Sequence, residues 1–291
     1  MADQHDNAAE HPHTGGNGDS PSRNHGVDPI VRLEHVTKSF DNHVVLDDLT
    51  LDIKRHRTTV VLGPSGTGKS VLLKHIVGLL RPDRGEVYFD GERIDQLSEH
   101  DLVAVRRKIG FLFQMGALFD SMTVEENIAF PLVEHTDLDS AQRGQRVDRG
   151  LRMVGLEGMQ RKMPAELSGG QRKRVALARA ISLEPSLILY DEPTTGLDPI
   201  RADVINELIV ALGRQLGITS IVVTHDMNSA NKIADHMVLL YDGKVVCKGD
   251  PEAFRTTDNE LVQNFIHGRA EQYELEAIRR GFERVTHETT D

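Results

Sequence analysis

The fold is decided by one stretch, Thr59-Val-Val-Leu-Gly-Pro-Ser-Gly-Thr-Gly-Lys-Ser70, in which an apolar run leads into a glycine-rich loop. A helical run over residues 71–80 follows directly. A strand, a glycine-rich loop and a helix in this order form the context that a phosphate-binding loop requires. Glycines let backbone N–H groups close around phosphates at the positive end of the helix. The stretch therefore predicts a nucleotide-binding α/β domain.

Individual residues of this loop have distinct expected roles. Lys69 is placed to contact the β and γ phosphates of a nucleoside triphosphate, and the Ser70 hydroxyl is placed to ligate Mg2+. ATP and Mg2+ are therefore the expected ligands. The other loop residues that we expect to hold the nucleotide are Gly63, Pro64, Ser65, Gly66, Thr67 and Gly68.

A second apolar run, over residues 187–190, ends in two carboxylates, Asp191 and Glu192. Open α/β sheets bind their ligands at the carboxyl ends of the strands. We expect Asp191 to hold the Mg2+ shell and Glu192 to polarise the attacking water, because hydrolysis of a γ-phosphate needs a positioned water. Alone, such a pair would more often be a solvated strand end. The phosphate loop upstream favours the catalytic interpretation.

The composition narrows the function classes. The 291 residues include 34 Lys and Arg against 45 Asp and Glu, and a net charge of −11 would repel nucleic acid, so no nucleic-acid partner is expected. No apolar run approaches the ~20 residues that a helix needs to cross a bilayer. The single cysteine, Cys247, cannot form an internal disulfide, and its apolar surroundings indicate a buried small hydrophobe.

The chain divides into three expected parts. Residues 1–29 are rich in glycine, proline and polar residues, which predicts a disordered acidic tail, and its scattered histidines are not assigned to a metal site. Residues 30–255 alternate apolar runs with helical segments, which predicts a doubly wound α/β core beside a small antiparallel sheet. Residues 256–291 are expected to form a C-terminal helical extension.

Smaller features refine the predicted domain. Val31, Leu33 and Val36 are expected on one buried face of the first strand, from the period of two. Asp-Gly pairs at 90–91 and 242–243 indicate turns between antiparallel strands. Residues from about 116 to 165 break the strand alternation and predict a helical insertion. Its expected helices are residues 124–130 and 146–154.

A third motif, Leu167-Ser-Gly-Gly-Gln171, precedes a basic helical stretch over residues 172–181. A serine and two glycines at a helix N-terminus expose donors for a second anion site. Here the chain resembles the ATP-binding-cassette (ABC) ATPases, whose signature sequence this is, over roughly residues 30–255. The resemblance implies the P-loop NTPase fold. It also implies a homodimer in which Ser168, Gly169, Gly170 and Gln171 of one subunit cap the γ-phosphate held by the other.

The resemblance implies four further site residues. Phe40 matches the aromatic residue that stacks on adenine, although a core phenylalanine would look the same. Gln114 matches the glutamine that joins the Mg2+ and water region to the helical insertion. Asp198 matches the loop that communicates across the dimer. His225 matches the histidine that contacts the γ-phosphate and orients the water, whereas an isolated histidine would more often be structural.

The resemblance also implies a role in transport. Such an ATPase would dock through its helical insertion on transmembrane permease subunits, as a peripheral protein on the cytoplasmic face of the inner membrane. Within the family the chain is most similar to the ATPases of Mla/MCE lipid-transport systems, through residues 112–120, 127–136 and 197–200. This similarity implies a phospholipid or another hydrophobic compound as cargo. It adds MCE-type lipid-binding subunits and small accessory subunits as expected partners.

Two other interpretations stay open. One is the ATPase of a small-solute importer, although sugar-import members often append a sizeable regulatory domain and only a short segment follows residue 255. The other is an ABC-type ATP switch without transport. Chromosome proteins of that class insert a long coiled coil between the phosphate loop and the signature, and too few residues separate Lys69 from Ser168 for one.

The C-terminal segment carries an apolar stripe. Leu275, Ile278, Phe282 and Val285 fall on one face of an expected helix over residues 271–284. A stripe of this kind needs a packing partner, and the Mla-type resemblance favours a contact with another subunit.

Overall fold

The computed structural model describes residues 28–270 together with 275, 276, 279 and 280. The tail expected at residues 1–29 lies outside the described residues, apart from its last two positions. The expected C-terminal stripe also lies outside the described residues, apart from Leu275, which is exposed.

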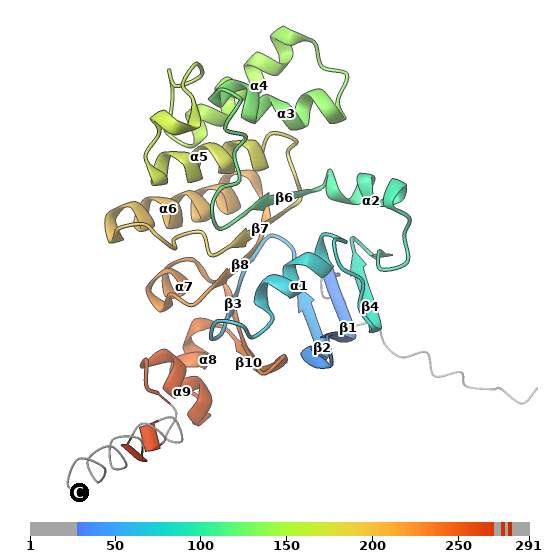
Figure 1. Ribbon diagram of the computed structural model, residues 1–291, viewed down its shortest axis with the longest axis vertical. Helices are drawn as coiled ribbons and strands as arrows, with labels where there is room; N and C mark the ends of the chain where they lie inside the picture. Colours follow the sequence, from blue (N-terminus) through green and yellow to red (C-terminus); the bar gives the residue numbers. More distant parts are fainter. Residues whose placement is uncertain (1–27, 271–274, 277–278, 281–291) are drawn as a thin grey trace, which may run out of the picture.

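A six-stranded, mostly parallel sheet forms the centre of the molecule, in the order β10-β9-β3-β8-β7-β6 (Figure 1). Every residue of β3 and β8 is buried, as the continuous apolar runs predicted. The edge strand β10 runs antiparallel to β9 after a turn at Asp242 and Gly243, which confirms the expected hairpin. The strands are β3 (Thr58–Leu62), β6 (Ile109–Leu112), β7 (Leu187–Asp191), β8 (Thr219–Thr224), β9 (His236–Tyr241) and β10 (Lys244–Gly249).

The register of this sheet aligns the ends of three adjacent strands. Leu62 ends β3 and pairs with Thr224, which ends β8. Asp191 ends β7, the next strand along, and pairs with the residue before Thr224. The loops after β3, β8 and β7 therefore leave the sheet at the same edge and at nearly the same level.

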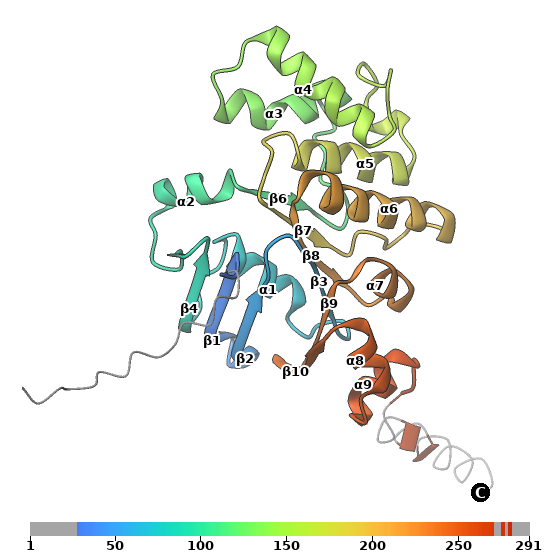
Figure 2. The same ribbon diagram turned by 180° about the vertical axis from the view of Figure 1, so that it is seen from behind.

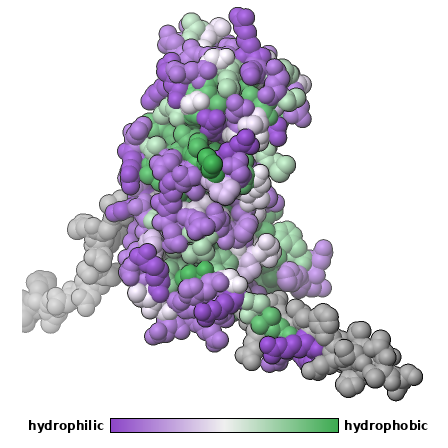
Figure 3. Space-filling view, turned by 90° about the vertical axis from the view of Figure 1, so that its left-hand side faces the viewer, coloured by the Kyte–Doolittle hydropathy of each residue, from purple (hydrophilic) through white to green (hydrophobic). Residues whose placement is uncertain are grey.

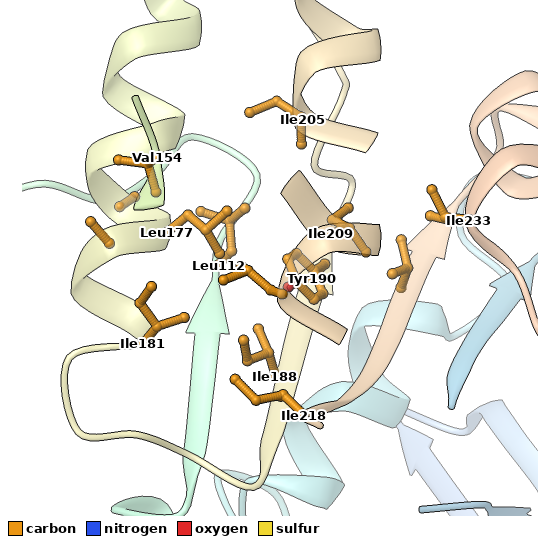
Figure 4. Packing of buried hydrophobic residues seen from close by; sticks show 14 of the residues in the cluster. Leu112, Val154, Leu177, Ile181, Ile188, Tyr190, Ile205, Ile209, Ile218 and Ile233 are labelled. Carbon is orange, nitrogen blue, oxygen red and sulfur yellow. The ribbon is translucent and has the colours of Figure 1, made fainter. Parts of the chain in front are cut away.

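Two hydrophobic clusters cover the two faces of the sheet. Successive side chains of a strand point to opposite faces, so Val60 and Leu62 join one cluster and Val61 the other. Helices α5, α6 and α7 pack on the first face, where Figure 4 shows Ile209 of α6 beside Tyr190 of β7. Helix α1 and the antiparallel strands cover the second face, as Figures 1 and 2 show from opposite sides. These helices are α1 (Lys69–Ile76), α5 (Gly169–Ala180), α6 (Pro199–Leu216) and α7 (Met227–Ile233).

A second sheet, in the order β2-β1-β4-β5, is antiparallel throughout, as predicted. Val31, Leu33 and Val36 are all fully buried, although a strict period of two would turn Val36 to the opposite face. A register shift after Leu33 restores the burial of Val36, and His35 there adopts a left-handed backbone with φ of 52°. The strands are β1 (Val31–Phe40), β2 (His43–Ile53), β4 (Arg84–Phe89) and β5 (Glu92–Arg93).

The helical insertion contains α3 (Val124–His135) and α4 (Ser140–Met153), which are longer than predicted. Helix α3 continues through Pro131, where the prediction ended, because the fully buried Ile128 and Leu132 on either side of it pack into the core. Capping boxes at the start of both helices satisfy backbone donors that the prediction did not consider. The remaining helices are α2 (Glu99–Arg106), α8 (Pro251–Thr256) and α9 (Glu260–Ile266).

Apolar side chains are gathered mainly in the two clusters. The face seen in Figure 3 is largely hydrophilic, with small separate hydrophobic areas. In the described part of the chain, every helix is too short or too polar to cross a bilayer. Cys247 packs against the first cluster but is only half-buried, less than predicted, and burial raises the pKa of its thiol.

Candidate functional site

The glycine-rich loop between β3 and α1 has a backbone that few side chains would tolerate. Gly68 caps α1 with a left-handed φ of 93°, and a Cβ atom at this position would lie 2.7 Å from the carbonyl oxygen of Val45. Glycine is therefore required here on both conformational and steric grounds. The result is a tight loop whose N–H groups surround the N-terminus of α1, which is the arrangement that binds phosphate.

Lys69 lies along this loop instead of extending into solvent. Its Nζ atom donates to the carbonyl oxygens of Gly63, at 2.8 Å, and Pro64, at 2.7 Å. Burial lowers the pKa of Lys69, and the carboxylates of Glu192 and Asp191 act in the opposite direction. The loop thus holds one cation against its own carbonyl oxygens beside the N-terminus of α1, where phosphate oxygens would meet the ammonium group and the backbone N–H groups.

Ser70 and Asp191 form a second pair beside the loop. The Ser70 hydroxyl donates to Asp191 Oδ1 at 3.1 Å, joining the first turn of α1 to the end of β7. Burial raises the pKa of Asp191, and the hydrogen bond from Ser70 counteracts this shift. A hydroxyl and one carboxylate fit Mg2+, which prefers hard oxygen ligands and usually takes only one or two from carboxylates beside substrate phosphates.

Glu192 and His225 meet at the ends of β7 and β8. His225 Nδ1 lies 3.0 Å from Glu192 Oε1, and the Thr195 hydroxyl donates to Glu192 Oε2 at 3.0 Å. Glu192 has a left-handed backbone with φ of 49°, which is strained for a residue with a side chain. Both carboxylate oxygens are therefore held by neighbours, and the orientation of the carboxylate is defined.

Lys69, Ser70, Glu192 and His225 line one cavity of about 300 Å³. Asp191 does not line it and is joined to it through the hydrogen bond from Ser70. Gln114, predicted from its motif, lines the cavity beside Lys69, Glu192 and His225. The sequence prediction therefore placed together residues from four separate segments that the structure also brings together. The cavity is lined by Val45, Ser65, Gly66, Gly68, Lys69, Ser70, Val71, Gln114, Glu192 and His225.

The predicted signature residues, all within the described part of the chain, do not line this cavity. Ser168 instead caps α5, where its hydroxyl accepts from Gln171 N and its own N–H donates to Gln171 Oε1 at 2.9 Å. The helix begins at Gly169 with Ser168 as its N-cap, which confirms the helix N-terminus expected at the serine and the two glycines. The N–H groups of Gly169 and Gly170 belong to the first turn and have no intrahelical acceptor, so α5 presents a second anion-binding end away from the cavity.

Gly63, Pro64, Thr67 and Asp191 also do not line the cavity, although each belongs to a segment that does. Phe40 and Asp198 lie on other segments. Phe40, at the end of β1, is 42% exposed, and Lys38 Nζ lies 5.4 Å from its ring centroid, so it is an accessible aromatic face and not a core residue. Asp198 caps α6 by accepting from Arg201 N at 3.0 Å. Ile200, beside it, is 80% exposed.

Asn127 is a residue of structural importance that the sequence did not reveal. It is fully buried in α3, and its Nδ2 atom donates to the carbonyl oxygens of Phe119, Met122 and Thr123 at 3.0–3.1 Å. Its Oδ1 atom accepts from Phe119 N at 2.9 Å. Asn127 therefore determines the path of the segment that follows Gln114.

Replacing Asn127 with alanine should lower the free energy of unfolding by about 3 kcal/mol, because the Phe119 N–H and the Met122 carbonyl oxygen lose the partner that the buried amide gives them. Urea denaturation at constant m-value measures this loss. Val133→Ala, at an exposed position of the same helix, serves as a control and should change stability by about 0.5 kcal/mol or less. Equal effects of the two substitutions would contradict the role given to Asn127.

Lys173 and Thr195 were also missed as site residues. Lys173 lies within the basic stretch after the signature, which the sequence prediction treats as a whole and does not divide into buried and exposed positions. Its spacing of three and four from the buried Ala176 and Leu177 is the signal that could have identified it as an inward-facing lysine.

Known proteins resemble this chain over most of its length. A family model described as ABC transporter matches residues 46–195. The relative named "Probable ribonucleotide transport ATP-binding protein mkl", from Mycobacterium leprae (strain TN), is 44% identical over 255 residues, which cover 88% of this chain and 72% of the relative. The intermembrane phospholipid transport system ATP-binding protein MlaF of Escherichia coli (strain K12) is 43% identical over 242 residues, covering 83% and 90% respectively.

Solved structures extend the similarity to the fold. The dimeric post-hydrolysis structure of the ATP-binding cassette MJ0796 bound to ADP and Pi has a TM-score of 0.70 at 36% identity and covers 76% of this chain and 98% of its own. The structure of cbiO1 from Clostridium perfringens, part of the transporter complex cbiONQ, has a TM-score of 0.73 at 32% identity and covers 82% and 98%.

Proposed function

This chain belongs to the ABC transporter family as an ATP-hydrolysing subunit, and from that premise we propose that it energises the transport of phospholipid or a related hydrophobic compound. The observation that carries the cargo class is the 43% identity to MlaF, whose name specifies intermembrane phospholipid transport. Ribonucleotide transport is the second candidate, because the mkl relative carries that name at 44% identity. Coverage of MlaF to 90% of its length, against 72% for mkl, favours the lipid.

In the proposed site, the chain's own residues divide the work. Lys69 and the loop amides would bind the β and γ phosphates, and Ser70, Asp191 and Gln114 would hold Mg2+. The metal, when bound, neutralises charge that develops on the phosphates. Glu192 polarises the attacking water, and His225, hydrogen-bonded to Glu192, orients it toward the γ-phosphate.

A second copy of the chain would complete each site. The signature residues lie outside the cavity of their own chain, and dimeric structures of similar cassettes support a paired arrangement. In a head-to-tail pair, Ser168 and the N–H groups of Gly169 and Gly170 would meet the γ-phosphate held by the partner. Phe40 would stack on adenine, and Asp198 with the exposed Ile200 would face the partner subunit.

The remaining partners follow from the transport role. The helical insertion, with the segment that Asn127 organises after Gln114, would receive transmembrane permease subunits. The chain would then lie peripherally on the cytoplasmic face of the membrane. MCE-type lipid-binding subunits and small accessory subunits are proposed as further members of the complex.

The cargo is tested by purifying the chain with its native membrane partners and identifying co-purifying lipids by mass spectrometry. We expect phospholipid to be enriched several-fold over the surrounding membrane, and phospholipid to stimulate ATP turnover of the complex by about threefold or more, as differential binding to one transport state requires. Ribonucleotides should leave turnover unchanged. Stimulation by ribonucleotides, without lipid enrichment, would favour the second candidate.

A further inference from the structure

Lys173 is a buried lysine of α5 that points at the turn after Glu192. It is 6% exposed. Its Nζ atom donates to the carbonyl oxygens of Pro193 and Thr195, each at 2.7 Å, and lies 3.4 Å from that of Glu192. One ammonium group thus holds three carbonyl groups of a single turn together.

This turn also sets the position of the Glu192 carboxylate. The strained backbone of Glu192 begins the turn, and Thr195, whose carbonyl oxygen Lys173 binds, donates its hydroxyl to Glu192 Oε2. A strained conformation persists only where its surroundings determine it. Lys173 supplies that restraint from outside the strand, because burial leaves its ammonium group only these carbonyl groups as partners among the contacts of the described chain.

The other end of the link is the signature. Lys173 lies five residues after Ser168 on the same helix, a rise of about 7.5 Å. A movement of the N-terminus of α5 would therefore be transmitted through Lys173 to the turn after Glu192. In the proposed dimer these two elements serve different ATP molecules, since Glu192 acts in its own chain's site and Ser168 in the partner's site.

We propose that Lys173 is a positioning residue that couples the two ATP sites of the dimer, by holding the Glu192 turn and the signature end of α5 in one rigid unit. This proposal rests on the function proposed above. In this arrangement Lys173 touches neither the nucleotide nor the attacking water. It acts only through Glu192 and Ser168.

The same helix offers a matched control. Arg174, the next residue, also donates to two backbone carbonyl oxygens, those of Val154 at 3.0 Å and Gly155 at 3.1 Å. Its target is the end of α4 in the helical insertion and not the Glu192 turn. Lys173→Met and Arg174→Met each remove one cation and comparable hydrogen bonds from α5, so a general loosening of the helix should affect both.

The test separates the two ends of the link with the full-length chain. In a Glu192→Gln background, ATP-driven dimerisation followed by analytical ultracentrifugation reports the signature end. With Glu192 intact, the single-turnover rate of ATP cleavage at saturating protein and ATP reports the Glu192 end. ATP affinity of the monomer and thermal unfolding check that each variant is folded.

For Lys173→Met we expect dimerisation to weaken about tenfold and single-turnover cleavage to slow about tenfold, with monomer ATP affinity within about twofold of the parent, since misplacement of a remote group acts on geometry and not on ground-state binding. Lys173→Arg should recover part of both losses. Arg174→Met should change neither by more than about twofold.

Three results would overturn the coupling. A change in dimerisation alone or in single-turnover cleavage alone would restrict Lys173 to one site. No change in either would remove it as a positioning residue. Equal effects of Arg174→Met would assign the losses to α5 as a whole. The parent chains test the underlying function separately. If Glu192→Gln hydrolyses ATP normally, or does not dimerise with ATP, the proposed function fails before Lys173 is considered.

Discussion

Replacing Glu192 with glutamine is expected to lower steady-state ATP turnover by a factor of about 100 to 1000, within the range that general-base catalysis contributes. Glutamine keeps the size and the hydrogen-bonding capacity of the side chain, so the contacts with His225 and Thr195 can persist, but the amide cannot polarise a water as a carboxylate does. ATP affinity should stay within about threefold of the parent, because the loss falls on the transition state. The ATP-bound dimer should therefore accumulate.

The steady-state rate of phosphate release measures the loss of ATP turnover. Gel filtration with ATP measures the accumulation of the dimer. Glu207→Gln, on the exposed face of α6, is the control for loss of a carboxylate. Its partner Lys232 keeps the ion pair with Asp203, so ATP turnover should not change. Near-normal turnover of the Glu192→Gln variant would remove this residue from its catalytic role.

The second large effect is expected at Lys69. Lys69→Ala removes an ammonium group that two loop carbonyl groups hold beside the N-terminus of α1. With charged hydrogen bonds contributing about 1.5–3 kcal/mol each, the loss of two contacts to phosphate should weaken ATP binding by a factor of about 100 or more. Isothermal titration calorimetry with ATP and with adenosine separates the phosphate contribution, because adenosine affinity should not change.

Lys54→Ala, at an exposed position directly after β2, is the control for loss of one positive charge. Retention of tight ATP binding by a folded Lys69→Ala variant would contradict the assignment of the loop. Thermal unfolding is needed beside the titration, since the carbonyl oxygens of Gly63 and Pro64 lose their donor in this variant.

Much of the fold could be predicted because its core strands are continuous apolar runs punctuated by glycine. The ends of α3 and α4 could not be predicted from apolar periodicity alone. The predicted helix ended at residue 130, yet α3 continues because the burial of Ile128 and Leu132 outweighs the hydrogen bond that Pro131 lacks. Helix α4 starts at the Asp139 cap. The residues that follow this cap are polar, so apolar periodicity does not show that the helix has begun.

The candidate site was predictable where a strand end or a motif carries the chemistry. Asp191 and Glu192 follow an apolar run, and parallel topology then brings them to the phosphate loop. The contacts of Thr195 and Lys173 could not be predicted from the sequence, because both depend on the left-handed turn at Glu192. That conformation is uncommon for a glutamate, so propensity gives no warning of it.

The aligned strand ends at the site edge set the separation of the loops that carry the site residues. Neighbouring strands lie about 4.8 Å apart, so the loops after β3 and β7, with β8 between them, start about 10 Å from each other. Inserting a strand between β3 and β7 would widen this separation by half, and slipping β8 by one residue would turn His225 to the opposite side. Loops at the far edge of the sheet carry no such constraint, so sequence change during divergence should concentrate there.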